Sequence, residues 1–339
     1  MSRSFILLFC GIFIPWQASV FATLQVSGKV SYAVFDKSGE RRQLANRTFR
    51  ATFDGCRWRI RTEVEPGSFG SSNSPFVYME IANGADSLFV TREFDENKLP
   101  PADSPVMTKS VTVSWGKTPY VDPEQLTGAI WFPYAWECEL GTITNGRIRN
   151  IFSMNDSLVR DDITFPFSVR YLSNSAAPVI QEVVIRNEGF WHVISPEGKA
   201  SHRPAKAPYS AGFVQSKFTA LEFTNVAELV VPRRSQIQYF MTKAGAITNT
   251  DTRLLGQVDV VASSITVTNF FLAPPELVKP PAMIYDKRLR RLGEEDFSYL
   301  SKGLVYETNS PEVERIYRKF DEIEILKAQA AEKARAKEK

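Results

Sequence analysis

Histidine is scarce in this sequence: 339 residues contain only His192 and His202. A zinc site built on histidine needs further ligands at close spacing, and neither residue has them. His192 follows Trp191 in an alternating segment, and His202 lies in a basic loop. We therefore interpret both as ordinary core or surface residues and expect no metal ion and no other cofactor.

Familiar catalytic motifs are also missing from the sequence. It contains no Gly-x-Ser-x-Gly, the turn that exposes the nucleophile of α/β-hydrolases. The Gly/Ser-rich segment 67–71 lacks the Lys-Ser/Thr ending of a phosphate-binding loop. Two acidic clusters, Asp161-Asp162 and 294–296, leave a hydrolase of envelope polymers open as a third alternative, because glycoside hydrolysis uses paired carboxylates. The sequence otherwise gives no positive support for an enzyme.

Neither sign of charge dominates, since 41 Lys and Arg oppose 38 Asp and Glu, for a net charge of +3. This excess is too small to predict nucleic acid as a partner. Arg57, Arg59 and Arg61 occupy alternate positions. We interpret this basic stripe as the wet face of a half-buried sheet. Contact with an anionic lipid or polysaccharide is the alternative.

Only one long apolar run occurs, over residues 5–16. It is shorter than the about 20 residues of a membrane-spanning helix. Arg3 precedes it and compact residues follow it up to Ala22, which is the order of a secretory signal peptide. We predict that residues 1–22 are removed after Ala22. The mature protein is then periplasmic or secreted, with no transmembrane segment after signal removal.

Cysteine is nearly absent, with three residues in the chain. Cys10 lies in the predicted signal peptide, where the bulky Phe9 disfavours lipid attachment. Cys56 and Cys138 remain as an even pair in an oxidising compartment, which predicts a disulfide. Two separate buried thiols are the alternative.

Strand-like alternation is abundant in the first third of the chain. Within 57–64, Trp58 and Ile60 alternate with the arginines of the basic stripe, as in a strand with one buried face. Asp54-Gly55 and Asn83-Gly84 are hairpin signals. Residues 23–95 therefore read as an antiparallel meander with one apolar face.

An aromatic segment over 126–140 interrupts this pattern. It contains Trp131, Tyr134 and Trp136 and is broken by Pro133. We interpret it as a buried helix-like insert, with a strand pair as the alternative.

Strand-like segments resume over 163–272, with a predicted hairpin around Asn187-Glu188-Gly189 and a basic loop over 196–211. The region 23–272 is then one antiparallel β domain, or two subdomains over 23–115 and 163–272.

The last part of the chain combines a Pro-rich linker and irregular segment, 273–309, with a charged helix, 310–339. Ser310-Pro311-Glu312 is a helix start signal. Val313, Ile316 and their successors at helical spacing give this helix an apolar face. The face packs on its own domain or docks a protein partner of the cell envelope.

The early meander resembles the LolA/LolB-like half-barrel of periplasmic lipoprotein carriers. The resemblance covers residues 24–95 and rests on the Phe49 strand, on 57–60 and on 83–90. It implies an antiparallel sheet curled around helices, with an apolar cavity that holds acyl chains. The chain departs from that family in its length, its aromatic insert and its charged C-terminal helix. It also resembles uncharacterised secreted bacterial proteins, and no family site residues can be transferred to it.

These observations predict a mainly β (α+β) fold: a curved antiparallel sheet or half-barrel with a buried aromatic helical insert and a C-terminal amphipathic helix. The expected function is non-enzymatic binding of a lipid, acyl chain or lipoprotein. An envelope structural or protein-interaction module is the alternative. The candidate cavity residues are Trp58, Ile60, Phe89, Trp131, Tyr134 and Trp136.

Overall fold

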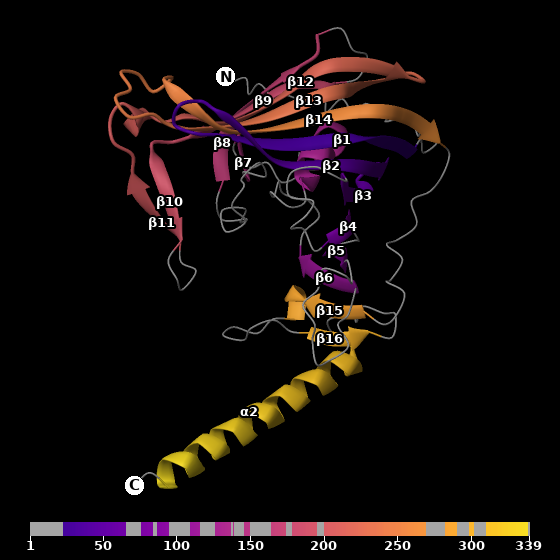
Figure 1. The fold of residues 1–339 in the computed structure, drawn as a ribbon, viewed down its shortest axis with the longest axis vertical. Coiled ribbons are helices and arrows are strands. Elements are labelled where there is room, and N and C mark those ends of the chain that lie inside the picture. Colours follow the sequence, from indigo (N-terminus) through magenta and orange to yellow (C-terminus); the bar gives the residue numbers. More distant parts are fainter. Residues whose placement is uncertain are drawn as a thin grey trace, which may run out of the picture.

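The computed structural model describes residues 23–65, 76–83, 87–94, 109–115, 126–136, 138, 146–149, 164–173, 178–194, 200–268, 282–289, 298–301 and 310–337. The predicted signal peptide, the Gly/Ser-rich segment and both acidic clusters lie outside these residues. The predicted mainly β fold is confirmed: one large curved sheet contains most of the described elements (Figure 1).

The large sheet has fourteen strands in the order β16-β15-β6-β5-β4-β3-β2-β1-β14-β13-β12-β9-β8-β7 among the described residues, with β16 and β7 at its open edges. All neighbours are antiparallel except β15 and β6. The strands are β1 (Thr23–Phe35), β2 (Arg41–Asp54), β3 (Arg57–Val64), β4 (Phe76–Asn83), β5 (Ser87–Phe94), β6 (Lys109–Trp115), β7 (Arg147–Arg149), β8 (Thr164–Tyr171), β9 (Ile180–Asn187), β12 (Phe213–Val226), β13 (Leu229–Thr242), β14 (Thr252–Thr268), β15 (Ala282–Asp286) and β16 (Ser298–Ser301).

The predicted meander is present as β1 to β5, each strand paired with the next. Gly55 turns β2 into β3 with a φ of 57°, in the left-handed region that glycine adopts without strain. The turn sets Phe53 opposite Trp58. Both side chains therefore lie on the same, buried face of the sheet.

Pairing of β1 with β14 places the regions 23–115 and 163–272 in one sheet. The register runs from Thr23 opposite Thr268 to Val34 opposite Gly256. A bulge at Gly28 brings the two backbones so close that a Cβ there would lie 2.1 Å from the carbonyl oxygen of Val261. Glycine is thus required at the junction of the two regions.

The inner face of the curved sheet is covered by α1 (Thr127–Ala135), as Figure 1 shows. The side chains of α1 share one core cluster with β1 to β3, β12, β13 and β14. The predicted buried helical insert is therefore confirmed.

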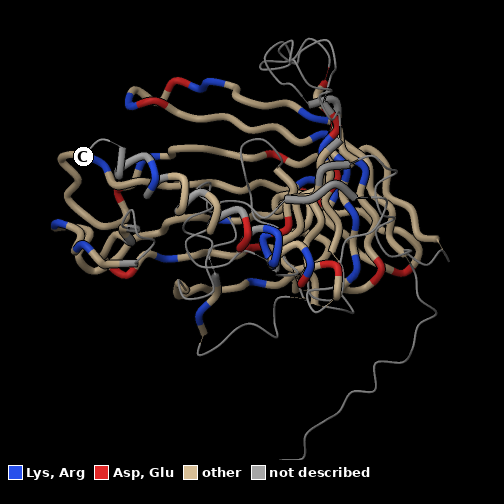
Figure 2. Tube along the Cα trace, turned by 90° about the horizontal axis from the view of Figure 1, so that it is seen from below, with Lys and Arg blue, Asp and Glu red and all other residues tan. Residues whose placement is uncertain are grey.

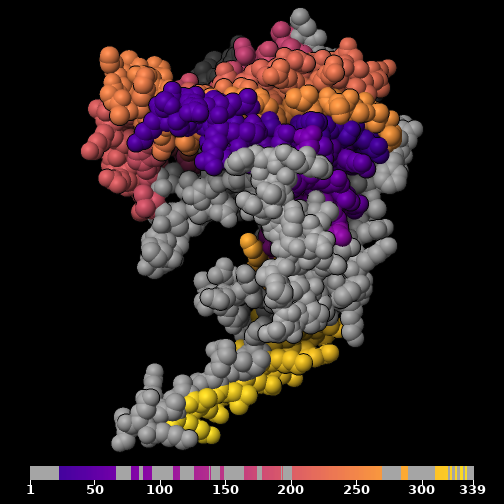
Figure 3. Space-filling view, viewed as in Figure 1, coloured from indigo at the N-terminus to yellow at the C-terminus, as the bar shows by residue number. Residues whose placement is uncertain are grey.

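A second core lies on the opposite face of the sheet, around β6 and β15. Val111, Val113 and Ile284 pack there against Val313 of α2 (Pro311–Lys337). The N–H of Val313 donates to Ser310 Oγ at 3.4 Å, so Ser310 caps the helix as its sequence predicts. Ile316 and Tyr317 also pack against this core, and beyond them α2 runs away from the sheet (Figures 1 and 3). Strands β15 and β16 lie within the segment 273–309, where the sequence predicts none.

The predicted hairpin around 187–189 is wrong. Asn187 Oδ1 accepts the N–H groups of Gly189 and Phe190 at 2.8 and 3.1 Å, and this side-chain turn directs the chain out of the large sheet. Strand β9 pairs with β8 and β12, whereas β10 (Phe190–Ile194) pairs with β11 (Ala200–Pro204) in a separate two-stranded sheet. His202 accordingly lies in a strand opposite His192, not in a loop.

None of the helices among the described residues is both long and apolar enough to cross a membrane.

Candidate functional site

The candidate site is the inner face of the sheet together with α1. The helix has apolar side chains on all sides, no side-chain cap at its N-terminus, and Pro133 in its interior. Leu126 precedes it with a φ of 56°, and its carbonyl accepts the N–H groups of Ala129 and Ile130. A nine-residue segment with a proline is a poor isolated helix. Packing against the sheet therefore holds α1 in its helical form.

Ring contacts provide much of this packing. Phe132 lies 4.6 Å from Phe218 of β12 and 5.3 Å from Trp136, measured between ring centroids. Trp136 in turn meets the ring of Phe167 of β8 at 6.2 Å. Contacts of this kind contribute about 0.5–1.5 kcal/mol each beyond the area that they bury. The aromatic insert thus spans from β12 to β8 across the inner face.

Tyr134 lies at the margin of the same core and is half-buried. Its ring lies 5.2 Å from that of Phe53, and its hydroxyl donates to the carbonyl of Pro232 at 2.9 Å. Burial raises the pKa of the Tyr134 hydroxyl well above its ordinary value of 10, because the phenolate would lose its hydration. Tyr134 therefore stays a neutral donor that ties α1 to β13.

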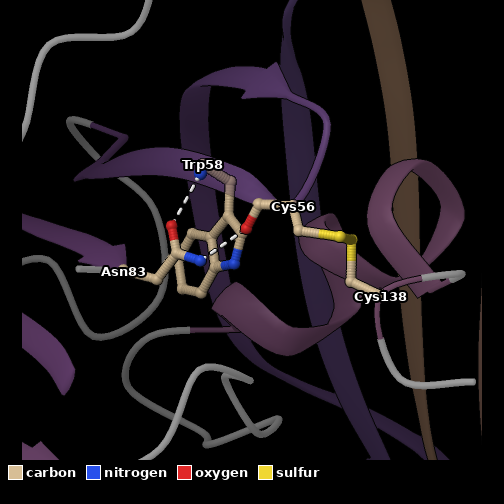
Figure 4. Close-up of a disulfide and its surroundings, with 4 residues drawn as sticks. All are labelled: Cys56, Trp58, Asn83 and Cys138. Atoms are coloured by element: carbon tan, nitrogen blue, oxygen red, sulfur yellow. Dashed lines mark hydrogen bonds between the residues drawn. A yellow bond between two sulfur atoms is a disulfide. The ribbon is translucent and has the colours of Figure 1, made fainter. Parts of the chain in front are cut away.

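The predicted pairing of the cysteines agrees with the structure, where the Cα atoms of Cys56 and Cys138 lie 5.5 Å apart and the sulfur atoms are joined (Figure 4). Cys56 lies in the turn between β2 and β3, and Cys138 follows α1. Asn83 fixes this turn: its Oδ1 accepts the N–H of Trp58 at 2.7 Å, and its Nδ2 donates to the carbonyl of Cys56 at 2.6 Å. The disulfide and Asn83 together connect the end of α1 to β3 and β4.

Five of the six candidate residues come together in the core beneath α1: Trp58, Ile60, Trp131, Tyr134 and Trp136. Phe89 does not join them. It is opposite Val113 and Ala82 in the register, on the face where α2 packs, and belongs to the second core. The site also includes Phe132, which belongs to the predicted aromatic insert, and Phe218, which the sequence argument did not select. Alternation along the strand marks Phe218 as buried, but not which residues it meets.

Three buried polar groups on this core have no hydrogen-bond partner among the described residues: Trp131 Nε1, Trp136 Nε1 and the Tyr239 hydroxyl. Burial, with Tyr32 as a neighbour, also raises the pKa of the Tyr239 hydroxyl well above 10. Buried polar groups are normally paired, and each exception needs a reason. These groups are two indole donors and a phenolic hydroxyl. The hydroxyl of Thr62, on the same face of β3 as Ile60, is also buried without a partner among the described residues.

The basic stripe lies on the outer face and is paired. Arg57 forms an ion pair with Asp54, and Arg59 lies 3.5 Å from Glu80. Arg61 lies 2.8 Å from Glu63 and covers the ring of Tyr78 at 3.9 Å. Basic and acidic residues are interspersed along the described elements (Figure 2). These pairs favour the interpretation of the stripe as a solvated sheet face.

The described residues contain no cluster of three or more His, Cys, Asp or Glu that could hold a metal ion. His192 and His202 are register partners in β10 and β11, and the ring of His202 lies 4.7 Å from that of Phe190.

Comparison with known proteins gives little further information. No family model matches the chain, and no curated protein matches it. Among solved structures, the chain is similar to a DUF1329 family protein from Desulfovibrio piger, with 6% sequence identity over 72% of this chain and 85% of that one. The TM-score is 0.29. A score this low does not establish a common fold.

Proposed function

We propose that this chain is an extracytoplasmic, non-enzymatic binding protein whose ligand is a lipid or acyl chain, held between the inner face of the sheet and α1. The unpaired polar groups of Trp131, Trp136 and Tyr239, which share one core cluster, are the observation that carries the proposal. An ester or carboxyl group offers acceptors for the Trp131 and Trp136 N–H donors, and an acyl chain suits the apolar side chains around them.

Binding in this place requires α1 to move, because its aromatic side chains already fill the core. A palmitoyl chain of about 14 methylenes contributes about 11 kcal/mol when buried, whereas exposing two aromatic side chains costs about 3–6 kcal/mol. Ordering the ligand costs part of the difference. The free energy gained by burying the acyl chain therefore exceeds the cost of displacing part of α1.

The features of α1 support such a movement. Its helical form depends on tertiary contacts, and the disulfide keeps its end attached to the β2–β3 turn. Because of this link, α1 can move off the sheet while its C-terminal end stays next to the β2–β3 turn. The disulfide and the predicted signal peptide also support a location outside the cytoplasm.

A second candidate function is an envelope interaction module that uses α2. Ile325 and Leu326 of this helix are 57% and 63% exposed, although both are large apolar residues. Exposed apolar residues on a projecting helix are typical of contact with another protein.

Fluorescence quenching by a brominated fatty acid tests the acyl-binding proposal, because bromine quenches only the tryptophans that it approaches. We expect the mature protein to be quenched, and the variant W131F/W136F to lose most of the quenching while retaining the fold. W191F is the matched control, since Trp191 lies in a different core cluster.

Native mass spectrometry of protein purified without detergent provides a second measurement. We expect a bound lipid mass that disappears on organic extraction. A clean apo mass, together with no quenching by added fatty acid, would contradict the proposal and favour the interaction module.

A further inference from the structure

A concave site lies apart from the filled core beneath α1, near the turn that joins β13 to β14. It is a groove of about 970 Å³ between the β10–β11 sheet, the segment 203–209, the β13–β14 turn and Lys37 of the β1–β2 turn. In Figure 1 these segments meet at the left end of the sheet. The volume is within the range of small-molecule sites.

Five cations line the groove: Lys37, Arg203, Lys206, Lys243 and Arg253. No Asp or Glu is among its lining residues. Lys243 lies 3.2 Å from Asp251, and Arg253 donates to the sulfur of Met241 at 3.3 Å. Within the described part of the chain, no ion pair occupies Lys37, Arg203 or Lys206, and all three are exposed. This concentration differs from the basic stripe, where each arginine has an acidic partner.

The walls of the groove are held by their own small core. The ring of Phe213 lies 5.5 Å from those of Trp191 and Tyr209, and Ala205 completes the cluster. The Tyr209 hydroxyl accepts the N–H of Lys243 at 2.8 Å and donates to the carbonyl of Asp251 at 2.5 Å. These bonds attach the β13–β14 turn to the segment around Tyr209. The groove between them is therefore held in shape by defined contacts.

We propose that this groove binds a ligand that presents at least two phosphate groups to it. Arg and Lys are the side chains that bind phosphate, and several of them around one cavity favour more than one negative charge. The partly exposed Trp191 gives the ligand an apolar surface to lie against. Two sources fit this chemistry: a soluble phosphorylated molecule and the headgroups of an anionic phospholipid surface. The proposal does not depend on the acyl site beneath α1.

Calorimetric titration with pyrophosphate, at low salt because exposed charges are screened, tests the soluble source. The groove variant is K37Q/R203Q/K206Q. Its matched control is R315Q/K319Q/K333Q, which removes the same charge from exposed positions of α2. We expect the groove variant to bind about tenfold more weakly than the unmodified protein, equivalent to about 1.4 kcal/mol. The control is expected to bind like the unmodified protein.

Flotation with vesicles of phosphatidylglycerol and phosphatidylcholine tests the surface source, with pure phosphatidylcholine vesicles as the reference. Binding to the anionic vesicles that the groove variant loses and the control keeps supports a headgroup. Equal weakening in both variants, or no binding of either probe by the unmodified protein, would overturn the proposal. Thermal unfolding checks that both variants remain folded. The quenching experiment on Trp131 and Trp136 reports separately on the acyl site, so the two proposals can fail independently.

Discussion

Asn83 shows how much one buried amide contributes to the site. Its side chain satisfies a backbone N–H of Trp58 and a backbone carbonyl of Cys56 at once, and it is almost fully buried. These two bonds attach the β2–β3 turn, and with it the disulfide, to the end of β4. The sequence marks this residue only as part of an Asn-Gly turn signal.

We predict that Asn83→Ala lowers the free energy of unfolding by about 2–4 kcal/mol, because two buried backbone groups lose their partners. Urea denaturation followed by circular dichroism measures the change. Gln25→Ala, at an exposed position of β1, is the control and is expected to change stability by less than about 0.5 kcal/mol. A loss no larger than that of the control would show that the Asn83 bonds are not needed.

At the scale of elements, α1 owes its position to the sheet and to one covalent link. The disulfide joins residues separated by 82 positions, and a loop of this length stabilises the folded state by about 4 kcal/mol in the chain-entropy account. We predict that C56S/C138S lowers the free energy of unfolding by this amount and increases the protease sensitivity of the segment around α1.

Denaturation of the unmodified protein with and without reductant provides the control. Reductant is expected to reproduce the loss of the double variant and to leave the variant itself unchanged. Equal stability of the oxidised protein and the variant would show that the link is dispensable.

Several elements follow directly from sequence patterns, and others do not. The alternation of Trp58 and Ile60 with arginines predicts β3 and its buried face, and Ser310 predicts the start of α2. Phe89 lies in a strand with the same alternation. Alternation does not show whether its side chain lies on the face that α1 covers or on the face that α2 covers. The core changes sides of the sheet between β3 and β6, so Phe89 packs near α2. The second core is formed by β6, β15 and α2, which are far apart in the sequence, so local alternation cannot predict it.

At the scale of the whole molecule, the β1–β14 ladder joins the strand regions 23–115 and 163–272 into one sheet. We predict that the two regions therefore unfold together. Hydrogen exchange measured by mass spectrometry at increasing urea should give one opening free energy for peptides from β2 and β3 and for peptides from β12 and β13. A lower value for either group would show two independent subdomains over 23–115 and 163–272.

The ladder between β1 and β14 also determines when folding can finish. Its outermost partners, Thr23 and Thr268, are separated by 245 positions. A chain synthesised from its amino end therefore presents β1 long before its second neighbour exists, and contacts at such separations slow folding. Until β14 arrives, β1 has a free edge that can pair with another chain. We therefore expect aggregation of the folding chain to start at this edge and to stop once β14 pairs with it.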